Sequence, residues 1–281
     1  MNILSKKLNA MKFKIISFCL ILVSIFVSCK KEPLSIVANS NMALLSKVMT
    51  DNQSSDEYIY NGLNLISEEK SKYDFTLHHY NSNNQLVSSD FYGNDDILSS
   101  NLQIYQTAMG RVDWVTPING SKGGTITYEY NSDAELIKTT YTRPSSTSSE
   151  YSLFSYDANN RINRQMMYWE NIETGYIDYS YDAKGNLLTE ALYNLSATGA
   201  AELITTTQYA YDNQQNPFKS FRQLMMPGIC TNVNNIIKET YTLNSNTVQA
   251  SNKIQITDNS YAYNTNGYPV SKNGNVSYIY K

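Results

Sequence analysis

Beyond about residue 42 the chain is built of short runs in which apolar and polar positions alternate. Many runs end in two aromatic residues separated by one other residue, as in Tyr179-Ser180-Tyr181. Side chains two residues apart lie on one face of a β-strand, so both tyrosines point the same way and Ser180 points to the opposite face. Asp or Asn follows, then three or four turn-forming residues, and then an aliphatic residue that starts the next run. This order predicts a β-hairpin at each copy.

The pattern occurs in seven full copies and one half copy. The second tyrosines of the full copies are Tyr60, Tyr80, Tyr130, Tyr156, Tyr181, Tyr211 and Tyr263, and Tyr280 ends the half copy. Successive members of this series are 20, 50, 26, 25, 30, 52 and 17 residues apart. Two gaps are about twice as long as the others. Each is therefore predicted to hide a degenerate hairpin, one around Tyr105 and one in residues 232–241.

The residue after each second tyrosine is predicted to form the turn, because Asp and Asn side chains bond to backbone N–H groups further along a turn. The predicted turn-formers are Asn81, Asn131, Asp157, Asp182, Asp212 and Asn264. In the first copy, Asn61-Gly62 matches a shorter, two-residue type I′ turn. Gly185 suits the left-handed position of its turn, whereas Ala134 and Gln215 are poor choices there and predict altered turns.

An aliphatic residue six places after the second tyrosine is expected to be buried. It is Leu86, Leu136, Ile162 or Leu187 in four copies. The last two full copies have Pro217 and Pro269 in this place. Phe218 and Val270 are expected to supply the apolar side chain there, one residue later.

The predicted fold is all-β, an antiparallel meander of repeated β-hairpins forming a curved sheet or open barrel. About eight hairpins give roughly 14–18 strands, which sheet twist should curl. Residues 44–48 are predicted to form a leading strand, and residues 222–235 break the pattern and should cap or cross one end. A membrane-spanning barrel is disfavoured, because Glu129, Asp178 and Gln208 would then face lipid.

These units resemble the YD repeats of Rhs-type proteins, and more closely the shorter repeat lipoproteins of Bacteroidetes classed as domains of unknown function with a porin-like β-meander. The resemblance runs from about Tyr58 to Lys281 through a degenerate Tyr-Asp-x-x-Gly-x-Leu motif. It implies hairpin repeats and is silent on activity. The irregular spacing, and the lack of the Pro- and Gly-rich core motif that precedes a toxin domain, separate the chain from true Rhs toxin cages.

The N-terminal residues match a lipoprotein signal peptide. Residues 15–28 are uncharged and follow Lys12 and Lys14, whether translation starts at Met1 or Met11. The run Phe26-Val27-Ser28-Cys29 resembles a bacterial lipobox, which implies that Cys29 is lipidated. A spanning helix needs about 20 apolar residues, so this run is too short. A plain cleaved signal remains the alternative.

The chain is thus predicted to consist of a signal peptide in residues 1–28, a tether in residues 29–41 and a hairpin-repeat domain in residues 42–281. A short charged stretch after the cysteine is similar to the export tethers of Bacteroidetes-type lipoproteins. The expected location is the outer membrane, lipid-anchored on its periplasmic or cell-surface face.

The net charge limits the expected partners, and the cysteine content limits the expected disulfides. The whole chain has a net charge of −3, and residues 1–28 contain four lysines and no acid, which leaves −7 for the mature part. Nucleic acids and anionic lipids require a basic surface, so neither is an expected partner. Cys230 is the only cysteine left after the signal and the lipid site are set aside, so no internal disulfide is expected.

Few residues suggest chemistry, and neither a metal nor a cofactor is expected. His78 and His79 are adjacent on a strand and face opposite sides, so they cannot chelate one metal together. No serine has an evident histidine partner. The 24 tyrosines are interpreted mainly as core residues whose hydroxyls reach the rim, with a sugar-stacking surface as the alternative.

The resulting hypothesis is a non-enzymatic, envelope-anchored interaction or scaffold protein. A surface glycan-binding protein is the second hypothesis, and either a glycan or an envelope protein would then be its partner. Three or more coplanar exposed rings in one groove would favour glycan binding, whereas burial of the rings would remove it. An enzyme is the third, and convergence of Asp, Glu or His side chains in a pocket would revive it.

Overall fold

The computed structural model describes residues 43–72, 74–93, 103–107, 110–114, 122–143, 147–221, 226–244 and 253–281. The predicted signal peptide, the tether and the lipidation site Cys29 lie outside these residues. Within them, no helix has the length and apolar character needed to cross a bilayer.

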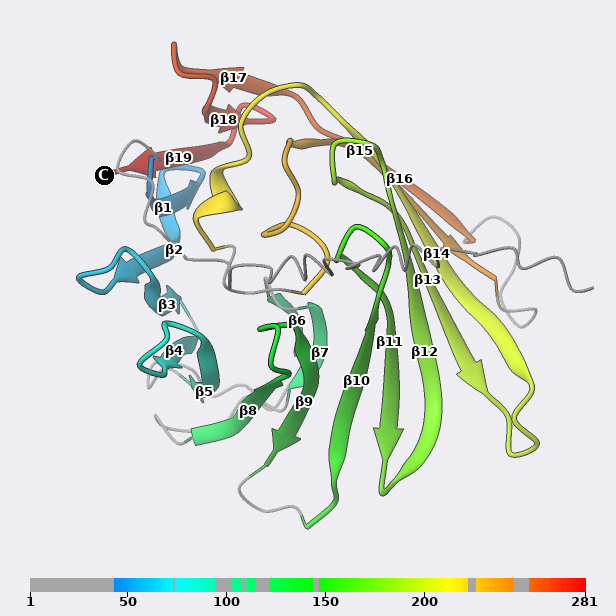
Figure 1. Cartoon of the computed structure of the whole chain (residues 1–281). Helices are drawn as coiled ribbons and strands as arrows, with labels where there is room; N and C mark the ends of the chain where they lie inside the picture. Colours follow the sequence, from blue (N-terminus) through cyan, green and yellow to red (C-terminus); the bar gives the residue numbers. More distant parts are fainter. Residues whose placement is uncertain are drawn as a thin grey trace, which may run out of the picture. The chain divides into compact units, whose positions relative to one another are not determined.

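The described part is almost entirely antiparallel β-structure, which confirms the predicted meander of hairpins (Figure 1). Its main sheet has 17 strands. They are β1 (Leu45–Thr50), β2 (Gln53–Tyr60), β3 (Ile66–Ser71), β4 (Asp74–Tyr80), β5 (Leu86–Gly93), β8 (Lys122–Tyr130), β9 (Leu136–Thr142), β10 (Glu150–Tyr156), β11 (Ile162–Trp169), β12 (Ile172–Tyr181), β13 (Leu187–Leu195), β14 (Ala201–Tyr211), β15 (Ile236–Leu243), β16 (Ile254–Asp258), β17 (Tyr261–Tyr263), β18 (Pro269–Lys272) and β19 (Val276–Tyr280). The strand β1 confirms the predicted leading strand.

Hydrogen-bonded pairing runs through the main sheet from β16 back to β1, and then through β19 and β18 to β17. The two edge strands β16 and β17 are therefore consecutive in the chain, separated by Asn259 and Ser260. No ladder joins them, so the sheet is not closed by hydrogen bonds between its edges.

Of the two long gaps between tyrosine pairs, only the first contains an additional hairpin. That hairpin includes Tyr105, so the hairpin predicted there is confirmed, although it is not part of the main sheet, whereas the one predicted in the second gap is wrong. In the first gap β6 (Gln103–Thr107) and β7 (Gly110–Trp114) form a separate two-stranded sheet, while β5 pairs directly with β8. In the second gap β15 is the partner of β14, with Tyr211 opposite Ile236. The spacing is long there because one turn is expanded, and an insertion in a turn lengthens the repeat without adding a strand.

Six of the Tyr-Asx turns close in the same way. The side-chain oxygen of Asn61, Asn81, Asn131, Asp157, Asp182 or Asn264 accepts hydrogen bonds from the backbone N–H groups two and four residues further on. The residue three places on has a positive φ in every case: Asn64, Asn84, Ala134, Asn160, Gly185 or Gly267. One side chain thus satisfies two backbone donors and sets the turn length.

Two turn predictions are wrong for this reason. In the first copy Asn64, with a φ of 59°, takes the left-handed position instead of Gly62, so this turn has full length and is not type I′. Ala134 adopts a φ of 62° in an otherwise ordinary turn. An alanine there is strained by about 1 kcal/mol, and the two bonds to Asn131 hold it. The turn that contains Gln215 is altered, as predicted.

The core lies under the aliphatic residues that follow the turns. Leu86, Leu136 and Leu187 are each 1% exposed. Pro269 is also buried and lies opposite Tyr263, while Val270 is 40% exposed, so Val270 does not supply the apolar side chain. Pro217 begins the short 3₁₀ helix η1 (Pro217–Phe221), and Ile236 takes the place expected for Phe218.

The second tyrosine of each hairpin links it to a neighbouring strand, except for Tyr263, whose hydroxyl donates to the Asp212 carboxylate. In the other hairpins the hydroxyl of this tyrosine donates to a backbone carbonyl: Tyr60 to Leu45, Tyr80 to Ile66, Tyr130 to Leu86, Tyr156 to Leu136, Tyr181 to Ile162, Tyr211 to Leu187 and Tyr280 to Pro269, over 2.6–2.9 Å. Most of these carbonyls belong to the buried aliphatic residue of the preceding hairpin. Phenylalanine could fill the space but not satisfy the carbonyl, which accounts for the excess of tyrosine.

Candidate functional site

The predicted turn-formers are spread over six turns, so they do not form one site. Their oxygen atoms are occupied by the turn hydrogen bonds described above. Asp157 also pairs with Arg161, whose guanidinium nitrogen lies 2.6 Å from its carboxylate. Burial acts in the opposite direction, but the hydrogen bonds from Arg161 hold the pKa of Asp157 below its ordinary value.

The turn after Tyr211 is the exception in length. Asp212 accepts a hydrogen bond from the backbone N–H of Asn235, 23 residues on, whereas Asp182 accepts the equivalent bond from Asn186, four residues on. Residues 212–235, here called the expanded turn, thus contain 19 more residues than an ordinary turn.

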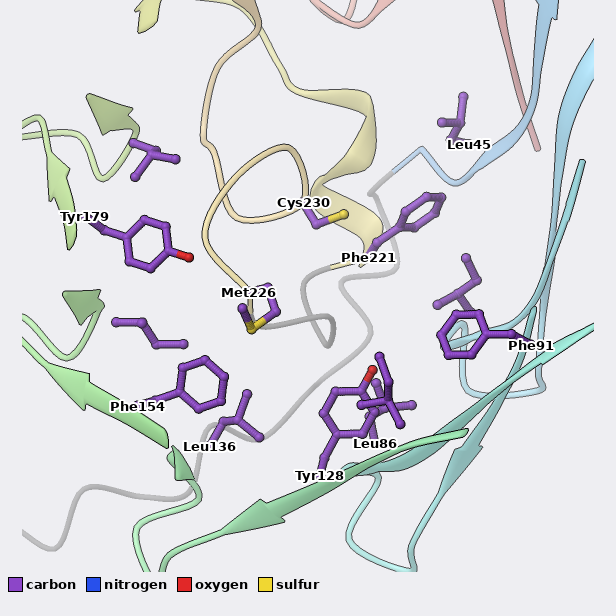
Figure 2. Packing of buried hydrophobic residues seen from close by; sticks show 14 of the residues in the cluster. Leu45, Leu86, Phe91, Tyr128, Leu136, Phe154, Tyr179, Phe221, Met226 and Cys230 are labelled. Carbon is purple, nitrogen blue, oxygen red and sulfur yellow. The ribbon is translucent and has the colours of Figure 1, made fainter. Parts of the chain in front are cut away.

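The expanded turn packs against the core-facing side of the sheet. Phe221 and Cys230 are fully buried and Met226 is 7% exposed, and all three belong to the same apolar cluster as Tyr128 and Tyr179 (Figure 2). Phe221 also lies against Tyr58 of β2, with ring centroids 4.7 Å apart. Residues 222–235 were expected to cap or cross one end, and two of them, Met226 and Cys230, are core side chains.

Buried asparagines hold the expanded turn in place. The side-chain oxygen of Asn186 accepts the backbone N–H groups of Val233 at 2.8 Å and Asn234 at 2.9 Å. Asn232 accepts the backbone N–H of Leu187 at 2.9 Å. An ordinary turn therefore anchors the expanded one.

A buried polar line crosses three strands. His78 Nδ1 lies 2.8 Å from Ser89 Oγ, and His78 Nε2 lies 2.8 Å from Glu69 Oε1. This serine–histidine pair could not be predicted from the sequence, because the two residues meet only where β4 and β5 place His78 directly opposite Ser89. Ser89 is 0% exposed and also lies 3.2 Å from the Tyr128 hydroxyl, so no substrate carbonyl reaches it.

Carboxylates crowd near this line. Burial, together with Glu69 and Asp74, raises the pKa of Asp56 to about 6. Among the described residues, no group of three or more His, Cys, Asp or Glu side chains could hold a metal ion.

The first tyrosine of several hairpins is buried and so cannot stack on a sugar. Tyr128, Tyr179 and Tyr278 are at most 9% exposed. The outer aromatic rings of the described strands instead stack in pairs: Phe75 on Tyr92, Tyr151 on Tyr168, and Tyr176 on Tyr193, with centroids 4.7–4.8 Å apart. The guanidinium of Arg164 covers the Tyr176 ring at 4.0 Å. These three repeat tyrosines are buried and the second tyrosines of the hairpins are partly buried, which weakens the observation that motivated glycan binding.

One strand connection exposes large apolar side chains. Trp169 and Ile172 lie opposite each other at the end of β11 and β12 and are 41% and 69% exposed. The two residues between them, Glu170 and Asn171, both have positive φ, as a tight type I′ turn requires. Trp169 and Ile172 form what we call the tip patch, and the stacked pair Tyr151–Tyr168 lies on the opposite face of the sheet.

A scan against protein-family models finds no match, and a search of curated proteins finds no similar sequence. Solved structures include a porin-like protein from Bacteroides uniformis, with a TM-score of 0.41 and 12% identity over 84% of this chain and 96% of that chain. A porin-like protein from Bacteroides vulgatus has a TM-score of 0.36 and 11% identity over 85% and 99%. A chain of the Photorhabdus luminescens Tc holotoxin pore has a TM-score of 0.29 and 13% identity over 75% of this chain and 10% of that chain.

Proposed function

We propose that this chain is a non-enzymatic interaction protein, lipid-anchored to the outer membrane through Cys29, that docks an envelope protein on the tip patch. The observation that carries the proposal is the exposure of Trp169 and Ile172 at the end of a rigid hairpin. Exposed apolar side chains at a turn are costly in water unless a partner covers them.

The chemistry of the patch suits a protein partner. Trp and Tyr supply a large share of the binding energy at protein interfaces, since they bury much area while losing few rotamers. The two-residue turn holds Trp169 and Ile172 in a defined arrangement.

Cross-linking in intact cells tests the proposal. A tagged full-length chain carrying Trp169→Ser and Ile172→Ser is expected to lose the partner that the unaltered chain captures. The control carries Ile254→Ser and Ile256→Ser on β16, which are similarly exposed at 61% and 55%. Equal capture by the unaltered and tip-patch chains would contradict the proposal.

The anchor is tested separately by Cys29→Ser. This change removes the thiol that would accept the lipid and touches no hairpin, so the protein should fold but leave the membrane fraction. Labelled palmitate should no longer be incorporated. Unchanged sedimentation and unchanged label would contradict the lipoprotein assignment.

A further inference from the structure

A small cavity lies between the expanded turn and the strands near the two sheet edges. Its volume is about 100 Å³, and its walls come from the expanded turn and from β15, β17, β18 and β19. Phe218, Tyr261 and Tyr278 give it aromatic walls. Glu239 of β15 and Lys272 of β18 supply a negative and a positive group.

These two charges face the cavity without pairing directly. Glu239 lies opposite Tyr209 on one side, and Lys272 lies opposite Tyr261, so both are on the face that carries the repeat tyrosines. Neither the Glu239 carboxylate nor the Lys272 ammonium group makes a hydrogen bond or a contact ion pair with any described residue. Opposite charges in a partly buried place normally pair, since removing them from water is unfavourable.

The electrostatics show that each charge is under-stabilised. Burial raises the pKa of the Glu239 carboxyl although Lys272 lowers it, and burial lowers the pKa of the Lys272 ammonium although Glu239 raises it. For both groups the loss of water outweighs the attraction between them. A bound molecule with complementary charges would reverse both shifts.

A third polar residue, Asn232, also lies on the cavity wall. Asn232 is 1% exposed, and its side-chain oxygen accepts the backbone N–H of Leu187. The Tyr211 hydroxyl donates to the Leu187 carbonyl and can still accept from the Asn232 nitrogen: burial raises the pKa of this hydroxyl, and hydrogen bonding with Asn232 lowers it. Glu239 and Lys272 are therefore the two groups on this wall that a ligand would satisfy.

We propose that this cavity binds a small zwitterion, an α-amino acid of the size of glycine or alanine. Its ammonium group would lie at Glu239, and its carboxylate at Lys272. The volume sets the size, because a cavity of about 150 Å³ holds a benzene ring, so about 100 Å³ suits four to six non-hydrogen atoms. This site shares no residue with the tip patch and does not depend on the proposed function.

Calorimetric titration of the detergent-solubilised full chain with glycine and with alanine tests the proposal. We expect saturable binding, with acetate and methylammonium each binding at least about tenfold more weakly, because each satisfies one charge only. Equal affinity for acetate, or no binding of either amino acid at about 10 mM, would overturn the proposal and leave the cavity to ordered water.

Two variants locate the site. Glu239→Gln and Lys272→Met are each expected to weaken amino-acid binding at least about tenfold. Glu202→Gln, on an exposed position of β14, is the matched control and should bind as the unaltered chain does. Circular dichroism checks that each variant is folded. Unchanged binding by both folded cavity variants would overturn the proposal, and the single-charge ligands test it on the unaltered chain if a variant does not fold.

Discussion

The ordinary turn 182–186 and the expanded turn 212–235 begin and end with the same hydrogen bonds, yet they serve different purposes. In both, an aspartate accepts the backbone N–H of a closing asparagine, Asn186 or Asn235, and the next residue is a buried or partly buried aliphatic. The ordinary turn reverses the chain and, through Asn186, anchors the expanded one. The expanded turn keeps that closure and adds 19 residues that fill the core and shape a cavity. A repeat fold can therefore gain new side chains inside a turn while its strand pairing is preserved.

The two turns are also physically connected. Asn186, which closes the ordinary turn, holds the backbone of Val233 and Asn234 in the expanded one. Asn186 therefore belongs to the ordinary turn and also anchors the expanded one. Substitutions in the two turns should consequently have unequal effects on stability.

The largest effect is expected for Asn186→Ala. Asn186 is 0% exposed, and its removal leaves the Val233 and Asn234 N–H groups without an acceptor, so the free energy of unfolding should fall by about 2–4 kcal/mol. Gln85→Ala is the control, since Gln85 occupies the same place in a turn that anchors no loop, and it should cost less than about 1 kcal/mol. Equal losses in urea unfolding would show that the anchoring bonds contribute nothing.

A smaller difference in the free energy of unfolding is expected between two substitutions that remove a tyrosine hydroxyl. Tyr181→Phe removes a hydrogen bond to the Ile162 carbonyl and should cost about 0.5–1.5 kcal/mol. Tyr263→Phe removes a bond to the Asp212 carboxylate of the expanded turn and should cost about 1.5–3 kcal/mol. Both are measured by chemical denaturation. A larger loss for Tyr181→Phe would reverse the expected order.

The smallest effect concerns the charge of the ordinary turn. Burial acts against it, but hydrogen bonds from Asn186 and the turn backbone lower the pKa of Asp182 below its ordinary value of 3.8. The stability that this carboxylate contributes is present above that value and is lost as the pH falls through the lower folded pKa. Asp182→Asn, which keeps the oxygen that accepts the two backbone N–H groups, should therefore cost under about 1 kcal/mol at pH 7, because the carboxylate is partly exposed. It should cost less near pH 2 than at pH 7, and a loss that is equal at both values would contradict this expectation.

The sequence predicted the hairpins because their signals are local. Two tyrosines separated by one residue and the Asx residue that follows them determine the structure of only a few neighbouring positions. The all-β meander and its leading strand could therefore be predicted from the sequence. The expanded turn was not, because the bond between Asp212 and Asn235 joins residues far apart in the chain, and a long gap can mean either another hairpin or a longer turn.

The candidate sites also depend on residues far apart in the chain, which become neighbours only through the register of the paired strands. His78 meets Ser89 and Glu69 only once three strands are aligned, and Glu239 and Lys272 come from strands near opposite edges of the sheet. Alternation in sequence shows which face a side chain occupies. It does not show which side chains on that face become neighbours.

The central claim is that the expanded turn is part of the core, and the thiol of Cys230 tests it most directly. Cys230 is fully buried, and burial raises the pKa of its thiol well above the ordinary value. The rate at which a thiol reagent labels Cys230, read by peptide mass mapping of the folded full chain, measures how often this turn leaves the core. The structure predicts labelling that is slow in buffer and rapid in denaturant. Labelling of the folded chain as fast as that of the unfolded chain would contradict the account.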